Sequence, residues 1–244
     1  MTDQIKSLTD VRPGDLYIGP IGGLVGVGVA LGEIALGEGF RAGKLSARHV
    51  GIVTQASQTL PPGSVYRGQV YETGVITAPR MAQAMPGGAE VIDLSQQQHW
   101  TARNAFVRLP EDYPGQAQDA AWVALAMVAE GVAYSPLSYG ALAAWHWGWR
   151  TGKLEGWIDR RRPWERIELP SERLAGVNPV QGEPVTPAVG FPVEAICSVF
   201  ADQAWSLAGK RVMEGVPRQV VTPGAMALQL WRRPGVVWGG YGLL

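Results

Sequence analysis

The order in which two kinds of periodicity occur along the chain limits its fold most strongly. Segments rich in β-branched and aromatic residues, bounded by glycine, proline or asparagine, fill the first half, and this pattern predicts strands. The expected strands are 14–19, 49–54, 64–73, 89–94 and 104–109. Helical spacing of apolar residues occurs only later and predicts helices at 114–131, 191–209 and 222–231. Strands grouped before helices are typical of an α+β domain.

Length and composition limit the possible classes of protein further. The 244 residues are 46% hydrophobic, which is enough for one large core, and we expect a single domain over 1–244. The formal net charge is zero, so the overall basic charge of a nucleic-acid-binding protein is absent. One cysteine cannot form an intrachain disulfide, and three scattered histidines lack the spacing of metal ligands. We therefore expect no cofactor, no metal and no nucleic-acid partner.

Two features bear on location. The N-terminal residues 1–15 are polar and lack the apolar stretch of a signal peptide. The most apolar early segment, 20–37, is interrupted by Glu33 and is too short to span a bilayer. We expect no stable membrane span and a cytoplasmic location, with a phage protein delivered to the cell wall as the alternative. The oligomeric state stays open.

Several nucleotide and hydrolase motifs fail on inspection. In GVGVALG (26–32) the final glycine comes one residue too late for a dinucleotide-binding fingerprint. The segment GFRAGKL (39–45) is one residue short of a phosphate loop, and Leu45 stands where a hydroxyl residue would bind magnesium. No GxSxG sequence occurs.

The stretch SARHVGIVT places His49 at the start of a predicted strand. A lone histidine there is most often a core or surface residue with a local hydrogen bond, and only its neighbours can indicate a site. If the next strand is 64–73, positions 49 and 72 are symmetric about a turn at Leu60 and Pro61, so Glu72 is expected opposite or diagonal to His49. An imidazole oriented by a carboxylate is two thirds of a nucleophilic triad.

Cys197 is the candidate for the third member. It lies in the first turns of a helix expected to start near Pro192, where the positive end of the helix dipole favours a thiolate. Alanines at helical spacing after it, Ala201, Ala204 and Ala208, would let this helix approach a sheet closely. Taken alone, a single cysteine is more often a small buried hydrophobic residue.

With these residues in order, the chain resembles the circularly permuted papain-like amidases, relatives of the NlpC-type cell-wall peptidases and of the lecithin retinol acyltransferase group. The resemblance rests on RPGDLYIG, RHVGIVT, VYETG, EGVAYSPLSY, AICSVFADQAWSLAG and VVTPGAMALQL. It implies an antiparallel sheet packed against helices. It also implies that His49 is the base, Glu72 the orienting carboxylate and Cys197 the nucleophile. Glutamate in place of a second histidine favours the bacterial amidase branch.

The implied activity is a cysteine hydrolase that cleaves an amide bond through an acyl-enzyme, with a cell-wall peptide as one candidate substrate. A lipid acyltransferase or deacylase of the same fold and a non-catalytic interaction module are the alternatives, so the expected partner is a peptide or lipid-like substrate. Backbone N–H groups at the start of the Cys197 helix are the expected oxyanion donors. Tyr134 and Ser198 are further candidates for substrate binding, although an ordinary capped turn is the favoured interpretation of Tyr134.

The resemblance does not cover a segment rich in tryptophan, arginine and proline at about 145–191. One interpretation is a helical insertion whose tryptophans pack on the core. The other is a surface beside the Cys197–His49 cleft that sets the choice of substrate.

Overall fold

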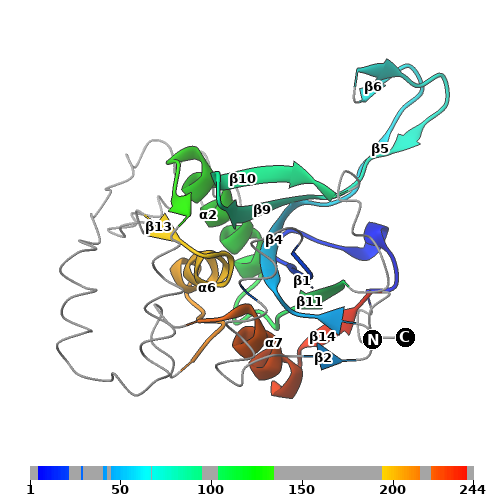
Figure 1. Ribbon diagram of the computed structural model, residues 1–244. Coiled ribbons are helices and arrows are strands. Elements are labelled where there is room, and N and C mark those ends of the chain that lie inside the picture. Colours follow the sequence, from blue (N-terminus) through cyan, green and yellow to red (C-terminus); the bar gives the residue numbers. More distant parts are fainter. Residues whose placement is uncertain are drawn as a thin grey trace, which may run out of the picture.

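The chain folds into an α+β structure in which an antiparallel sheet packs against three helices (Figure 1). The computed structural model describes residues 5–21, 29, 41–42, 45–66, 68–94, 104–134, 194–214 and 221–240. The α+β class predicted from the sequence is therefore confirmed. The predicted insertion at 145–191 lies outside the described residues.

The central sheet has six strands in the order β10-β9-β4-β1-β11-β14, and every neighbouring pair is antiparallel. The strands are β1 (Leu16–Gly19), β4 (His49–Gln55), β9 (Arg80–Met85), β10 (Gly88–Asp93), β11 (Ala105–Arg108) and β14 (Val237–Gly239). Strands β1, β4, β10 and β11 fall where their sequence patterns predicted them. Strands β9 and β14 were not predicted.

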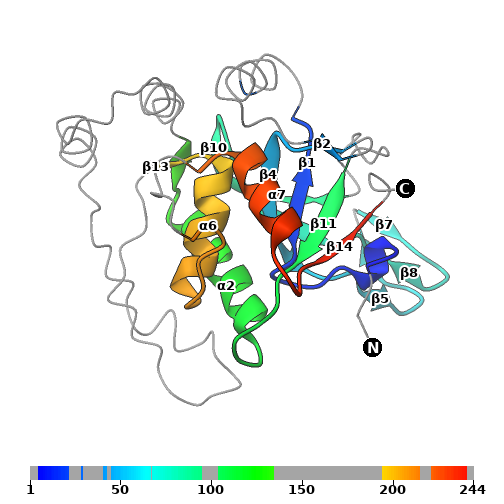
Figure 2. The same ribbon diagram turned by 90° about the horizontal axis from the view of Figure 1, so that it is seen from below.

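Helices α2 (Gln116–Ala129), α6 (Cys197–Leu207) and α7 (Pro223–Arg232) lie on one side of this sheet (Figure 2). Helix α7 begins as predicted, because the Thr222 side chain accepts a hydrogen bond from the Ala225 N–H and caps its first turn. Helix α6 begins at Cys197, five residues later than Pro192. The preceding strand β13 (Glu194–Ala195) instead pairs in parallel with β12 (Ala133–Tyr134).

The sheet buries apolar residues on both faces, and alternation along the strands separates them. Leu16, Val50 and Ile52 face the helices and pack with residues such as Phe200 and Ala204 of α6. The opposite face carries Tyr17, Val53, Met81 and Phe106, and it is covered by the N-terminal residues Ile5 and Val11 together with Leu8 of the short 3-10 helix η1 (Leu8–Asp10). The face on which a strand residue lies therefore decides whether it meets the helices.

Between β4 and β9 the chain leaves the sheet and forms two small antiparallel ribbons that project from the body of the molecule (Figure 1). One pairs β5 (Thr59–Leu60) with β8 (Val75–Ile76), and the other pairs β6 (Val65–Tyr66) with β7 (Gln69–Val70). The single strand predicted over 64–73 is therefore wrong. The chain reverses beside Gly68, whose φ of +73° is accessible to glycine at little cost. A further ribbon joins β2 (Arg41–Ala42) to β3 (Leu45–Ser46).

The turn before β1 ties the sheet to the helices. Gly14 has a φ of +87°, and its carbonyl accepts a hydrogen bond of 3.2 Å from the Trp205 indole of α6. Asp15 beside it accepts two hydrogen bonds from the Arg108 guanidinium of β11, at 2.9 and 2.8 Å. The start of β1 is thereby held to the C-terminal half of α6 and to the next strand of the sheet. Among the described residues, no helix is both long and apolar enough to cross a lipid bilayer.

Candidate active site

His49 is the first residue of β4 and lies at one end of the sheet, opposite Gly19, the last residue of β1. Its side chain is 2% exposed. Val50 packs on the helix face, so alternation directs His49 to the opposite face, where its ring meets Tyr17 edge-on with centroids 6.3 Å apart. His49 is therefore a buried imidazole in an aromatic environment.

The partner of His49 is Gln83 of β9, with 2.7 Å between the imidazole Nε2 and the amide Oε1. The Gln83 amide nitrogen in turn donates to Glu90 Oε1 of β10 at 2.8 Å. Because an ionised carboxylate only accepts, Gln83 presents its NH₂ group to Glu90 and its oxygen to His49. Nε2 then carries the proton of the neutral imidazole, and Nδ1 is the basic nitrogen.

The predicted pairing of His49 with Glu72 is not what the structure shows. That pairing requires one simple hairpin with a turn at Leu60 and Pro61. The strand that pairs with β4 is β9, with Ile52 opposite Ala82, and Glu72 lies on an exposed bend of the projecting ribbons. Gln83 takes the position beside the imidazole that was predicted for Glu72.

Burial controls the protonation of His49. Loss of solvation lowers the pKa of His49 to about 4, because the charged imidazolium is disfavoured in a dry environment, and the hydrogen bond to Gln83 offsets only part of this. The imidazole is consequently neutral at neutral pH and able to accept a proton. Within the described residues, its Nδ1 has no hydrogen-bond partner.

Cys197 is the first residue of α6, and its side chain is 1% exposed. The N-cap residue, Ile196, supplies no side-chain hydrogen bond to the first turn of this helix, so the cap leaves the first N–H groups to other acceptors. The predicted small face of the helix is present, because Ala201, Ala204 and Ala208 are buried against the sheet.

Cys197 and His49 lie at the same end of the sheet, but among the described residues no group, the Cys197 thiol included, is hydrogen bonded to His49 Nδ1. Trp205, in the C-terminal half of α6, is anchored near the start of β1, and α6 begins at the end of the sheet where β1 finishes opposite His49 (Figure 2). Helix α6 covers the face of Val50, whereas His49 belongs to the other face. The structure thus brings the two residues to one edge of the fold without joining them.

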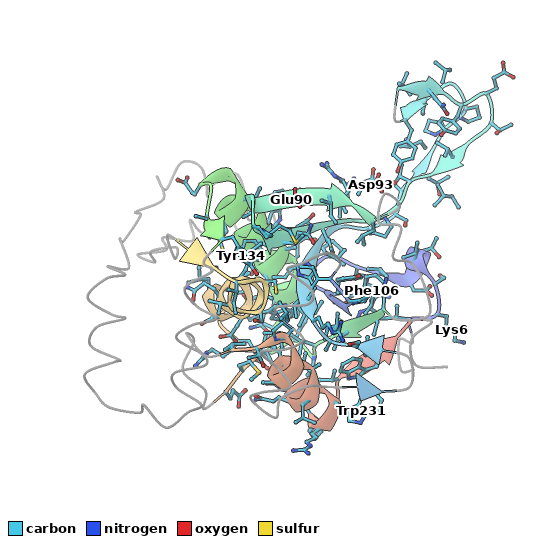
Figure 3. All side chains as sticks on the ribbon, in the orientation of Figure 1. Lys6, Glu90, Asp93, Phe106, Tyr134 and Trp231 are labelled. Atoms are coloured by element: carbon cyan, nitrogen blue, oxygen red, sulfur yellow. The ribbon has the colours of Figure 1, made fainter. Side chains whose placement is uncertain are left out.

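Tyr134 and Ser198 have different surroundings. Tyr134 is half-buried on β12 and is in register with Ala195, two residues before Cys197 (Figure 3). It therefore lies next to the start of α6. Ser198 is fully buried and donates a 2.6 Å hydrogen bond to the Val221 carbonyl. Its hydroxyl joins α6 to the segment before α7 and is not placed for the predicted contact with substrate.

Tyr17 is a site residue that sequence reasoning missed. It is 1% exposed, and its hydroxyl has no hydrogen-bond partner among the described residues. A Cβ placed on Gly19 would lie 2.5 Å from Tyr17 Oη and 2.8 Å from Asn104 Oδ1, so both oxygens lie over the residue that faces His49 across the ladder. The alternation of β1 could have assigned Tyr17 to the face of His49, but not its unpaired hydroxyl.

The described residues contain no group of three or more histidine, cysteine, aspartate or glutamate side chains that could hold a metal ion. The chain matches no protein-family model, no curated protein and no solved structure.

Proposed function

We propose that the protein is a cysteine hydrolase of the permuted papain-like type that cleaves an amide bond, with Cys197 as nucleophile, His49 as base and Gln83 as the residue that orients the base. The observation that carries this proposal is the His49–Gln83 hydrogen bond of 2.7 Å. It fixes the proton on Nε2 and leaves a neutral, basic Nδ1 at the end of the sheet where α6 presents the sole cysteine of the chain.

In the proposed reaction the Cys197 thiol gives its proton to His49 Nδ1, and the sulfur attacks the carbonyl carbon of the substrate. Backbone N–H groups at the start of α6 stabilise the oxyanion. The C–N bond then breaks, and the imidazolium returns the proton to the leaving amine. Water, deprotonated by His49, attacks the thioester, the C–S bond breaks, and the thiol regains its proton.

Geometry sets a requirement on this mechanism. Both reacting side chains are nearly inaccessible, at 1% for Cys197 and 2% for His49, and helix α6 covers the face of the sheet opposite to the one on which His49 lies. The reaction therefore requires that Sγ reach Nδ1 around the ends of β1 and β4 and that this edge open to admit a substrate. Because the pKa of His49 is about 4, the imidazole is neutral at rest, and a resting thiolate–imidazolium pair is disfavoured.

The test measures alkylation by iodoacetamide across pH, which reports on Cys197 alone because the chain has no other cysteine. We expect wild type to react faster than a His49→Gln variant, with the denatured protein as the reference for an unassisted thiol. Turnover of peptide amides and of lipid esters is measured beside it, and Cys197→Ala should abolish both. Equal alkylation rates in wild type and His49→Gln, with no turnover of either substrate class, would leave the protein a non-catalytic module.

A further inference from the structure

Three side chains on three adjacent strands form a hydrogen-bonded chain that runs from the molecular surface to the buried imidazole. Glu90 is exposed on β10, the edge strand of the sheet (Figure 3). It lies directly opposite Gln83 in the ladder and bonds to its amide nitrogen, and Gln83 bonds to His49. Gln83 and His49 are each 2% exposed, so water has little access to the inner two members.

Glu90, at the molecular surface, sets the direction in which the hydrogen bonds of this series donate and accept. The oxygen and the NH₂ group of a glutamine amide have nearly the same shape, so the amide can present either of them to a neighbour. The Glu90 carboxylate removes this choice, since it can only accept a hydrogen bond and therefore holds the NH₂ group of Gln83. The amide oxygen must then face His49, which has to offer a protonated Nε2.

The opposite arrangement would move the basic nitrogen. If the Gln83 amide turned over, its NH₂ group would face Nε2, and Nε2 would have to be unprotonated to accept a hydrogen bond. The proton of the neutral imidazole would then lie on Nδ1. Two buried donors that face each other cost about 1–3 kcal/mol. We therefore expect the orientation of the Gln83 amide and the tautomer of the His49 imidazole to change together.

We propose that Glu90 is a positioning residue that selects the Nε2-protonated tautomer of His49 by fixing the direction of the Gln83 amide. The tautomer part of this inference follows from the three side chains alone. Its consequence for catalysis rests on the proposed function, because only an unprotonated Nδ1 can take the proton of the Cys197 thiol. Glu90 touches neither reacting group, and it acts through Gln83.

The experiment reverses the charge at the surface end. In a Glu90→Lys variant the ammonium group donates to Gln83 Oε1, which turns the NH₂ group toward His49. Nitrogen-15 NMR of the imidazole at neutral pH distinguishes the two tautomers. We expect the Nε2–H form in wild type and the Nδ1–H form in Glu90→Lys. Glu90→Gln, which can donate or accept at this position, should give a mixture of the two forms.

Glu72→Lys is the matched control, because it makes the same charge change on an exposed bend away from the chain of hydrogen bonds. It should keep the wild-type tautomer. Glu90→Lys and Glu90→Gln spectra that both retain the wild-type Nε2–H form would overturn the inference. Since Glu90 is exposed on an edge strand, both variants are expected to fold, and circular dichroism checks this.

Turnover separates this inference from the proposed function. If both hold, Glu90→Lys lowers kcat by about 100-fold, the usual scale of a lost general base, with little change in KM. A tautomer that inverts without any loss of turnover supports the role of Glu90 and removes His49 as the base. Absence of turnover in every form of the protein contradicts the proposed function, while the NMR result still decides the role of Glu90.

Discussion

His49 is a residue whose burial makes the stability of the whole protein depend on pH. Its pKa is about 4 in the folded chain against an ordinary value of 6.5. Between these values the unfolded chain binds a proton that the folded chain does not, so the free energy of unfolding must fall as the pH is lowered through this window. The full loss amounts to about 3 kcal/mol.

We expect urea unfolding between pH 6.5 and pH 4 to show this loss in wild type and to show a smaller one in His49→Gln. Taking the difference between the two proteins removes the contributions of the carboxylates and of the other histidines. An NMR titration of the wild-type imidazole measures the folded pKa directly. A titration centred near the ordinary histidine value would contradict the prediction.

Tyr17 offers a second test at the scale of one residue. Burial raises the pKa of its phenol, which therefore stays protonated and able to donate. Because the hydroxyl has no partner among the described residues, Tyr17→Phe should leave stability unchanged or raise it by up to about 1 kcal/mol. Under the proposed function the same change should lower kcat/KM, by about 10-fold or more if Oη supports the oxyanion. Wild-type kcat/KM in a stabilised variant would assign Tyr17 to packing alone.

At the scale of elements, local patterns predicted what depends on local sequence. β-Branched and aromatic residues bounded by glycine, proline or asparagine located β1 and β4, and the segment TPGAMALQLW located α7 to within one residue. Strand β9, RMAQAM, was missed because alanine and glutamine favour strands weakly, and its place beside β4 is a long-range pairing. Helix α6 starts late because Glu194 and Ala195 pair with β12, which is again a contact between distant segments.

The residues of the candidate site also divide into those that local sequence predicts and those that depend on long-range pairing. His49 was found because a polar residue heads an apolar strand, and Cys197 because it is the sole cysteine and lies near a helix start. Gln83 was not predicted because it is an amide rather than a carboxylate and because it lies on β9, beyond the simple hairpin that the sequence suggests. The register of β4 against β9 fixes the partner of His49, and that register depends on where the chain returns to the sheet after residue 79.

The turn before β1 is an element whose geometry only glycine satisfies. At Gly14, φ is +87°, and an added Cβ would lie 2.3 Å from the Ala117 carbonyl oxygen of α2. Gly14→Ala should therefore destabilise the protein by roughly 2–5 kcal/mol, from the left-handed backbone and from the clash together. Gly63, with φ +83° and nothing within 4 Å of an added Cβ, provides the matched control.

We expect Gly63→Ala to lower the free energy of unfolding by about 1–2 kcal/mol, because only the left-handed backbone conformation is strained there. The difference between the two variants in chemical denaturation isolates the close approach of the turn to α2. Equal losses in the two variants would show that this approach adds nothing to stability.

At the scale of the whole molecule, the sheet carries a core on both faces, and the projecting ribbons add to neither core. Val65, Val70 and Ile76 on these ribbons are 66%, 66% and 59% exposed. The link from the outer ribbon to the body is Tyr66, whose hydroxyl donates to Asp93 Oδ2 at 2.8 Å and accepts from the Ala78 N–H at 3.2 Å. The candidate site lies on β4, β9 and β10 and at the start of α6, within the body.

This arrangement predicts that the outer ribbon can be removed. Leu60 and Val75 face each other across the inner ribbon, so an Asn-Gly turn can join them in place of residues 61–74. The loss of the two Tyr66 hydrogen bonds should cost about 1–3 kcal/mol. Cooperative unfolding and the low pKa of His49 should persist, because β4, β9 and β10 keep their pairing.

The excision also decides between Glu72 and Gln83 as the partner of the imidazole, because it removes Glu72 and leaves Gln83 in place. Under the proposed function, the shortened chain should turn over substrate at the wild-type rate. In the full-length chain, Gln83→Leu should disorder the imidazole and lower kcat, whereas Glu72→Gln should change neither kcat nor the His49 titration. A shortened chain that unfolds cooperatively but has lost turnover would place the ribbon, and Glu72 with it, back in the site.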